Sequence, residues 1–105
     1  MPRLKQEVTM LTGKQRSYLK GLAMNMDTAV YIGKAELTDT VLKEMNDYLA
    51  AHEMVKVKVQ EGSELSAKEA ANAAAEKLGA QFVQAIGRRF VLYRPSEDQK
   101  IQLPR

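Results

Sequence analysis

The chain has 105 residues, the size of one compact domain, and 45% of them are hydrophobic, which excludes a wholly disordered chain. No apolar run approaches the ~20 residues that a membrane span needs, and the N-terminal segment lacks the apolar core of a signal peptide. The absence of cysteine excludes disulfides and cysteine-based zinc sites and is typical of a reducing, cytoplasmic compartment.

Positive charge is concentrated at the two ends of the chain. Residues 1–35 carry six basic and two acidic side chains, a net of +4, and residues 80–105 carry five and two, a net of +3. Residues 36–79 carry five basic and nine acidic side chains, a net of −4. If the two ends meet in space, they create a basic side that suits a polyanion. Ordinary solubilising charge is the alternative.

The first part of the chain predicts a loose lead-in, a helix and a strand. Residues 1–10 form the lead-in, and the helix begins at Thr12, because Thr12 and Gln15 have the spacing of a capping box. A short strand is expected at residues 29–32. The apolar face of the helix is expected to contain Leu11, Tyr18, Leu19, Leu22 and Ala23.

The middle of the chain predicts a helix, a strand and a second helix. Thr38 begins a helix with an apolar stripe at helical spacing, and residues 54–59 alternate strictly, as in a strand with one buried and one wet face. Ser66 and Glu69 form another capping box, which opens an alanine-rich helix that stops at Gly79.

The last part of the chain predicts a β-hairpin. Residues 81–86 and 89–94 form its strands, and Gly87-Arg88 suits a type II′ turn. The order α-β-α-β-α-β-β then predicts an α+β fold with three helices on a mixed four-stranded sheet. We place the domain at residues 11–95 and expect residues 96–105 to pack on it as a C-terminal tail.

Catalysis has little support in this sequence. The single histidine, His52, lies at the end of the second predicted helix and cannot form a metal site without carboxylates. The GxSxG motif of hydrolases and the glycine-rich phosphate motifs are absent. We therefore predict a protein that is not an enzyme and has no cofactor, metal or small-molecule substrate.

Three groups of residues are candidates for binding phosphate. Gly33 and Lys34 precede a helix N-terminus, whose dipole favours anions, although the carboxylate of Glu36 in the same loop would repel them. Arginines at a hairpin offer bidentate hydrogen bonds to phosphate, and a glycine within a helix permits close approach of another backbone. A solvated polar surface is the alternative reading of each group. The candidates are Lys14, Arg16, Lys20 and Gly21 in the first helix, Gly33 and Lys34 in the loop, and Arg88, Arg89 and Arg94 in the hairpin.

Several short stretches occur together in one order and spacing. They are Leu11–Arg16, Leu19–Ala23, His52-Glu53 with Val55–Lys58, Ile86-Gly87 with Val91–Pro95, and Lys100–Arg105. With them the chain resembles the YhbY-like single-domain CRM proteins, bacterial RNA-binding proteins associated with assembly of the large ribosomal subunit. The resemblance implies a fold similar to the C-terminal domain of bacterial translation initiation factor three. It also implies RNA binding through a basic surface that includes a GxxG loop, here Gly33–Glu36, with Glu36 in place of the second glycine.

The leading expectation is a monomeric, cytoplasmic RNA-binding protein that contacts large-subunit ribosomal RNA or its precursor during ribosome assembly. Two alternatives remain open. RNA could lie on an open sheet face that carries Lys56 and Lys58, with bases stacked on Tyr31 or Tyr93. The chain could instead be a protein-interaction module that docks on a ribosomal protein or assembly factor through its acidic middle segment.

Overall fold

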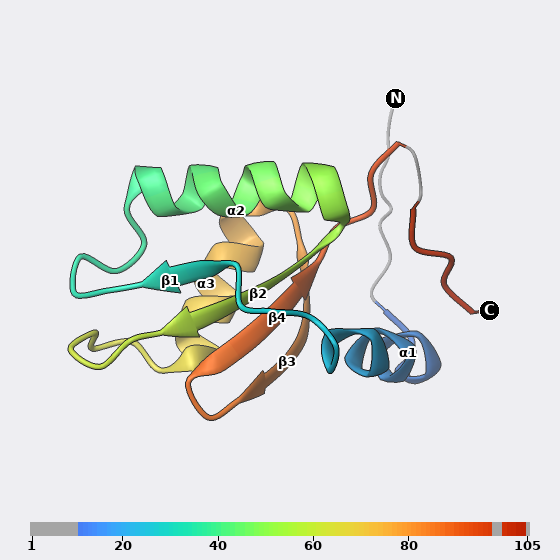
Figure 1. Ribbon diagram of the computed structural model, residues 1–105, viewed down its shortest axis with the longest axis horizontal. Helices are drawn as coiled ribbons and strands as arrows, with labels where there is room; N and C mark the ends of the chain where they lie inside the picture. The colour runs from blue at the N-terminus through green and yellow to red at the C-terminus, as the bar shows by residue number, and fades with distance from the viewer. Residues whose placement is uncertain (1–10, 98–99, 105) are drawn as a thin grey trace.

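The computed structural model describes residues 11–97 and 100–104. Figure 1 shows the elements of this part of the chain: helices α1 (Gly13–Ala23), α2 (Asp39–His52) and α3 (Ala67–Leu78), and strands β1 (Val30–Ile32), β2 (Met54–Val59), β3 (Gln81–Ile86) and β4 (Arg89–Tyr93). Their order is the predicted one, and the predicted fold class is confirmed. The lead-in predicted for residues 1–10 lies outside the described residues.

The strands form a mixed sheet in the order β1-β2-β4-β3. β1 runs parallel to β2, whereas β4 is antiparallel to both β2 and β3. β3 is thus an edge strand of the sheet. Its register with β4 shifts between Phe82 and Gln84 in a β-bulge. Gly87 has a φ of 60° and Arg88 has no positive φ, as the predicted type II′ turn between β3 and β4 requires.

Each helix begins at the predicted capping residue. The hydroxyl groups of Thr12, Thr38 and Ser66 each accept a hydrogen bond from the backbone N–H three residues later. α3 ends at Gly79, which adopts the left-handed conformation that glycine favours. α2 ends differently, because Glu53 occupies the left-handed position with a φ of 69°. A side chain costs roughly 1–2 kcal/mol in that conformation, so other contacts must hold Glu53 there.

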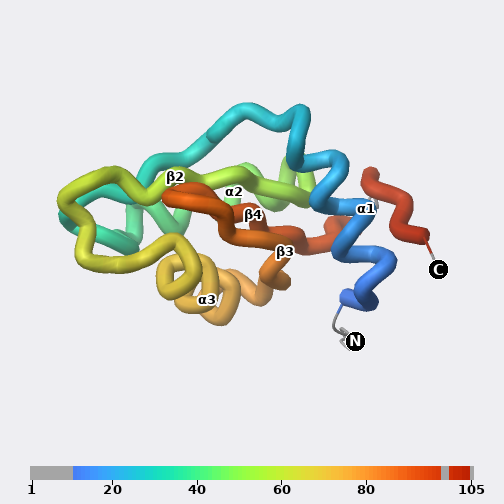
Figure 2. The backbone as a smooth tube through the Cα atoms, turned by 90° about the horizontal axis from the view of Figure 1, so that it is seen from below, coloured from blue at the N-terminus to red at the C-terminus, as the bar shows by residue number. Residues whose placement is uncertain are grey.

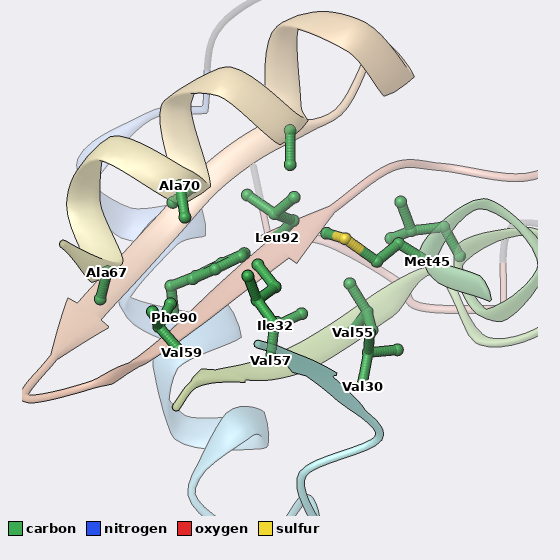
Figure 3. Packing of buried hydrophobic residues seen from close by; sticks show 13 residues of the cluster. Val30, Ile32, Met45, Val55, Val57, Val59, Ala67, Ala70, Phe90 and Leu92 are labelled. Atoms are coloured by element: carbon green, nitrogen blue, oxygen red, sulfur yellow. The ribbon is translucent and has the colours of Figure 1, made fainter. Parts of the chain in front are cut away.

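One face of the sheet is covered by α2 and α3. Figure 3 shows Met45 from α2 beside Ile32, Val57 and Leu92, all of them buried, with α3 lying over the same cluster. The side of α3 that meets the strands consists of alanines, among them the fully buried Ala70. Small side chains allow the helix to lie close to the sheet, as the alanine-rich sequence predicts.

The opposite face is covered only in part, by α1 and by Ile101 and Leu103 of the C-terminal residues. This helix packs on the sheet through Leu19 and Ala23, which are fully buried. The predicted apolar face of α1 is therefore partly wrong, because Tyr18 and Leu22 stay 43% and 37% exposed. The helix is turned so that Arg16, rather than Tyr18 or Leu22, lies half-buried against the sheet, where its Nε donates a hydrogen bond to the carbonyl of Phe82 at 3.4 Å.

Candidate nucleic-acid interface

A groove of about 660 Å³ follows β3, between α1 and the start of α3. Figure 2 shows β3 running between these two helices. Residues 82–87 form the floor, Arg16 and Lys20 of α1 form one wall, and Lys68 of α3 lies on the other. None of the described residues that line the groove is acidic. We call this feature the β3 groove. Its cations on both walls create a positive channel suited to an anionic chain.

α1 presents its two groove cations one helical turn apart. Residues four positions apart lie on the same side of a helix, which places Arg16 and Lys20 on one flank. The hydrogen bond to Phe82 fixes the Arg16 guanidinium at the edge of β3, whereas Lys20 is exposed. A Cβ atom added at Gly21 would meet no other atom within 4 Å. Packing inside the protein therefore does not require this glycine, whereas close approach of a ligand backbone would use it.

Lys68 is a groove residue that sequence reasoning missed. Lys68 lies two positions after the Ser66 cap, and an exposed lysine in the first turn of a helix is ordinary. Only the tertiary fold places it opposite α1. The carboxylate of the neighbouring Glu69 accepts a hydrogen bond from the backbone N–H of Ser66. This bond lowers the pKa of Glu69, and the hydrogen bond with the Ser66 hydroxyl adds a smaller effect of the same sign. Because this carboxylate already occupies the helix start, Lys68 rather than the helix N-terminus provides the positive charge on this wall.

The Gly33–Lys34 loop lies at the other end of the sheet from α1 (Figure 1). The stem of Lys34 packs over Gly62, where an added Cβ atom would come within 3.2 Å of the Lys34 side chain. Glu36 adopts the left-handed conformation with a φ of 62°, and its carboxylate accepts a hydrogen bond from the backbone N–H of Glu64 at 3.1 Å. The loop is thus braced by the acidic loop that precedes α3, and the structure separates it from the basic residues of α1.

Arg88 and Arg89 belong to two different surfaces. Arg88 is exposed at the hairpin tip, directly after Gly87, which lines the end of the β3 groove. Arg89 lies on the sheet face that α1 covers in part, and its Nε donates a hydrogen bond to the hydroxyl of Thr28 at 3.2 Å. Arg88 therefore extends the groove, whereas Arg89 extends the charge onto the sheet.

Arg94 is held by the protein itself. Its guanidinium donates hydrogen bonds to the side-chain and backbone oxygens of Asn46 in α2 and to the carbonyl of Leu78 at the end of α3. Burial lowers the pKa of Arg94. Because three of its hydrogen bonds join two helices to the end of β4, we leave Arg94 out of the proposed RNA surface.

The two lysines of β2 also have different partners. The Nζ of Lys56 donates hydrogen bonds to the carbonyls of Ala23 and Met26 at the end of α1, so this lysine anchors the helix. Lys58 is half-buried on the same sheet face, beyond α1. Tyr93 is only 4% exposed, whereas Tyr31 is 51% exposed. Of the two tyrosines considered for base stacking, Tyr31 is therefore the accessible one.

Glu53 is a second residue whose role sequence reasoning missed. Among the residues that the structure describes, it is the one buried charged side chain. Burial alone would raise its pKa, but the hydroxyl of Ser96 and the backbone N–H groups of Ile101, Ser96 and Lys100 donate hydrogen bonds to the carboxylate. These bonds prevail and place the pKa of Glu53 below its ordinary value. They also fix the left-handed conformation that ends α2.

The C-terminal residues bound by Glu53 continue to α1. The Nε2 of Gln15 donates a hydrogen bond to the carbonyl of Pro104 at 3.1 Å. Ile101 and Leu103 pack against the hydrophobic cluster beneath α1. Through these contacts the chain after β4 connects the end of α2 to the helix that carries two of the groove cations.

The described residues contain no group of three or more histidine, cysteine, aspartate or glutamate side chains that could hold a metal ion. In the same part of the chain, none of the helices is long and apolar enough to cross a membrane.

Comparison with known proteins identifies the family. Residues 11–94 match the family model described as the CRS1/YhbY (CRM) domain. The chain belongs to this family. The match covers every described helix and strand, together with the β3 groove and the Gly33–Lys34 loop. The resemblance inferred from the sequence motifs is thus confirmed.

Relatives of this CRM domain are named for RNA binding. A Haemophilus influenzae protein named "RNA-binding protein" is 44% identical over 93% of this chain and 99% of its own. "Probable RNA-binding protein YqeI" of Bacillus subtilis is 35% identical over 90% of this chain and 100% of its own. The solution structure of the hypothetical Staphylococcus aureus protein SAV1595, described as a candidate RNA-binding protein, is 40% identical, with a TM-score of 0.77 over 90% of this chain and 100% of its own. These names describe RNA-binding proteins and not enzymes, in agreement with the expectation from the sequence.

The CRM domain brings some of the candidate residues together and separates others. Arg16 and Lys20 share the β3 groove, which continues towards Arg88. Lys14 and Gly21 are exposed on α1 outside the groove lining. Gly33 and Lys34 lie at the far end of the sheet, Arg89 lies on the sheet face, and Arg94 joins α2 to α3. The fold therefore does not place all nine residues in one continuous patch.

Proposed function

We propose that this CRM-domain protein binds RNA and that the β3 groove holds the RNA backbone. The observation that carries the proposal is the convergence of Arg16, Lys20 and Lys68 on one open groove with no acidic residue in its described lining. Each cation that neutralises a phosphate releases counterions and adds salt-sensitive affinity. The names of the relatives support the same class of ligand.

The proposed path extends beyond the groove at both ends. Lys14 and Gly21 on the outer side of α1 accept the backbone at one end, and Arg88 at the hairpin tip continues the path at the other. The Gly33–Lys34 loop is a separate and weaker contact, because Glu36 places a carboxylate beside any phosphate held there. Arginine and lysine differ in these roles, since a guanidinium can bind phosphate in a bidentate manner.

We further propose that the bound RNA is large-subunit ribosomal RNA or its precursor, contacted by a monomer in the cytoplasm during ribosome assembly. The resemblance to the YhbY-like proteins supports this target. Crosslinking in cells, followed by sequencing of the bound RNA, tests it, and enrichment of large-subunit sequences is expected. Enrichment of other RNA contradicts the target. If the pure protein ignores RNA at low salt but co-purifies with one protein, the interaction-module alternative replaces the proposal.

The groove itself is tested with paired charge variants. Lys20→Gln combined with Lys68→Gln removes one cation from each wall and is expected to weaken RNA binding at least tenfold in a fluorescence-anisotropy titration. Lys43→Gln combined with Lys77→Gln removes the same charge from exposed sites outside the groove and serves as the control. Equal losses in the two double variants would show that net charge, rather than the β3 groove, governs binding.

A further inference from the structure

The register of the sheet places four side chains in one row across all of its strands. Tyr31 of β1 pairs with Lys58 of β2, Lys58 pairs with Arg89 of β4, and Arg89 pairs with Ile86 of β3. Directly paired residues have their side chains on the same face, and neighbouring strands lie about 4.8 Å apart. We call Tyr31, Lys58, Arg89 and Ile86 the sheet-face row.

The row lies on the part of the sheet that no described helix covers. α2 and α3 pack on the opposite face, and α1 covers this face at its other end, over the cluster that includes Met54, Val91 and Tyr93. Tyr31 is 51% exposed and Ile86 is 69% exposed. Exposed Tyr31 thus lies beside Lys58, and exposed Ile86 lies beside Arg89.

We propose that the sheet-face row is a binding site for single-stranded RNA, in which an unpaired base stacks on Tyr31 and backbone phosphates contact Lys58 and Arg89. This inference rests on the proposed RNA binding and adds the form of RNA that is recognised. An exposed aromatic ring beside cations combines stacking with charge, the two contacts that single strands use. A duplex keeps its bases stacked and offers none to the ring.

The position of Arg89 fits this role. Its hydrogen bond to the hydroxyl of Thr28, just before β1, crosses β2 and directs the guanidinium towards the strand that carries Tyr31. A planar guanidinium held in this way can contact phosphate or stack on a second base. The charged side chains that share this face in β2 are Lys56, which is bound to the end of α1, and Lys58.

The row is continuous with the β3 groove. Ile86 lines the groove and is also the last member of the row. A strand whose backbone lies between Arg16, Lys20 and Lys68 would leave the groove at Ile86 and meet Arg89, Lys58 and Tyr31 in turn. The groove then supplies phosphate contacts that any RNA can use, whereas the row selects RNA with an unpaired segment.

The experiment compares single-stranded and duplex RNA on variants of the full chain. Probes are a 12-nucleotide oligouridine, a 12-nucleotide oligoadenine and a 12-base-pair RNA duplex, measured by fluorescence anisotropy. Tyr31→Ala is expected to weaken binding of the single strands at least about fivefold and to leave duplex binding within about twofold. Tyr31→Phe retains the ring and is expected to bind as the wild type does. Tyr18→Ala removes an exposed tyrosine of α1 that lies outside the row and is the matched control.

The outcomes separate this inference from the proposed function. If Tyr31→Ala binds single strands as tightly as wild type, or loses duplex binding equally, the row is overturned while RNA binding stands. If wild type binds none of the three probes, both proposals fail. Backbone amide chemical shifts give a second readout that does not depend on the variant. Changes at residues 31, 58 and 89 on adding oligouridine support the row, and changes confined to α1 and α3 overturn it.

Discussion

Glu36, which occupies the position of the second glycine in the GxxG pattern, adopts a backbone conformation that glycine favours. A φ of 62° is one that glycine adopts without cost, so the backbone of this loop keeps the glycine-like geometry although the residue is different. The carboxylate is turned towards the backbone N–H of Glu64. A glycine at position 36 would therefore fit the same backbone conformation without strain and would remove the carboxylate from the loop.

We predict that Glu36→Gly leaves the free energy of unfolding within about 1 kcal/mol of wild type and tightens RNA binding. Relief of the left-handed strain offsets the lost hydrogen bond and the greater freedom of glycine in the unfolded chain. Chemical denaturation and RNA titration measure the two effects. Glu36→Gln keeps the backbone conformation and removes the charge, so tightening in both variants identifies repulsion as the cause. Weaker binding in both would mean that Glu36 positions the loop.

Glu53 shows how one buried carboxylate can organise residues that are distant in sequence. The bonds it accepts come from Ser96, Lys100 and Ile101. An ionised acceptor suits this set because every partner is a donor. The residue ends α2 and at the same time fixes the chain that follows β4.

We predict that Glu53→Gln lowers the free energy of unfolding at pH 7 by about 2–4 kcal/mol, because the amide group of glutamine faces donors that need an acceptor. The folded-state pKa of Glu53 is lowered, so its ionisation stabilises the protein fully above the ordinary value of 4.5 and less as pH falls through the lower folded-state pKa. In denaturation experiments between pH 3 and 7, the free energy of unfolding of Glu53→Gln should therefore fall less steeply towards acid pH than that of the wild type. Glu44→Gln, at an exposed site, should show the same pH dependence of unfolding free energy as the wild type. Identical pH dependence in all three proteins would contradict the stabilising role of ionised Glu53.

At the scale of elements, the arginines of the hairpin divide by function. Arg94 connects the end of β4 to α2 and α3, so its contacts are internal. Arg88 is exposed at the tip, and it is the carbonyl of Arg88 that accepts a hydrogen bond from Val59, at 2.7 Å. A substitution at position 88 keeps that backbone contact and removes only the guanidinium.

We predict opposite effects for two alanine substitutions in this hairpin. Arg94→Ala should lower the free energy of unfolding by about 2–3 kcal/mol, because carbonyl groups of two helices lose a charged donor. Its RNA affinity, measured where the protein is folded, should stay near wild type. Arg88→Ala should leave stability unchanged and weaken RNA binding. Thermal melts paired with anisotropy titrations distinguish the two, and a loss of RNA affinity in folded Arg94→Ala would return this residue to the interface.

At the scale of the whole molecule, α1 and β3, which belong to the two basic ends of the sequence, lie side by side. α1 packs beside β3, and the two elements share the β3 groove with the start of α3. The acidic middle of the chain is not uniform, since Lys68 of that segment faces the groove while Glu61 and Glu64 lie in the loop beside Lys34. The net charge of each segment thus predicted a basic side, but it did not predict that Lys68 would belong to it.

We predict a steep salt dependence for RNA binding by the complete domain. Four phosphate contacts give a slope near −3 for log K against log salt, at roughly 0.7 per contact with single-stranded RNA. Lys20→Gln combined with Lys68→Gln removes two contacts and should reduce the magnitude of the slope by about 1.4. Titrations from low to moderate salt measure both values. A binding constant that does not change with salt would contradict the electrostatic model of the site.

Local sequence signals determined the elements of this protein. Thr12, Thr38 and Ser66 predicted where the helices begin, the alternation in residues 54–59 predicted β2, and Gly87 predicted the turn of the hairpin. Such signals act within a few residues, so they can be read without knowledge of the fold. Together with the motifs shared with the CRM family, they were sufficient for the fold class.

Tertiary structure decided which side chains meet. No local pattern predicted that Lys68 faces Arg16 and Lys20. Nor did one predict that Lys56 and Arg94 bind helix ends, or that Glu53 binds residues that follow β4. An open sheet face with Lys58 and Tyr31 was one of the alternatives from the sequence, but the order and register of the strands are needed to align these residues with Arg89 and Ile86. These contacts depend on packing between segments far apart in the chain, whereas periodicity reports only which face of its own element a residue occupies.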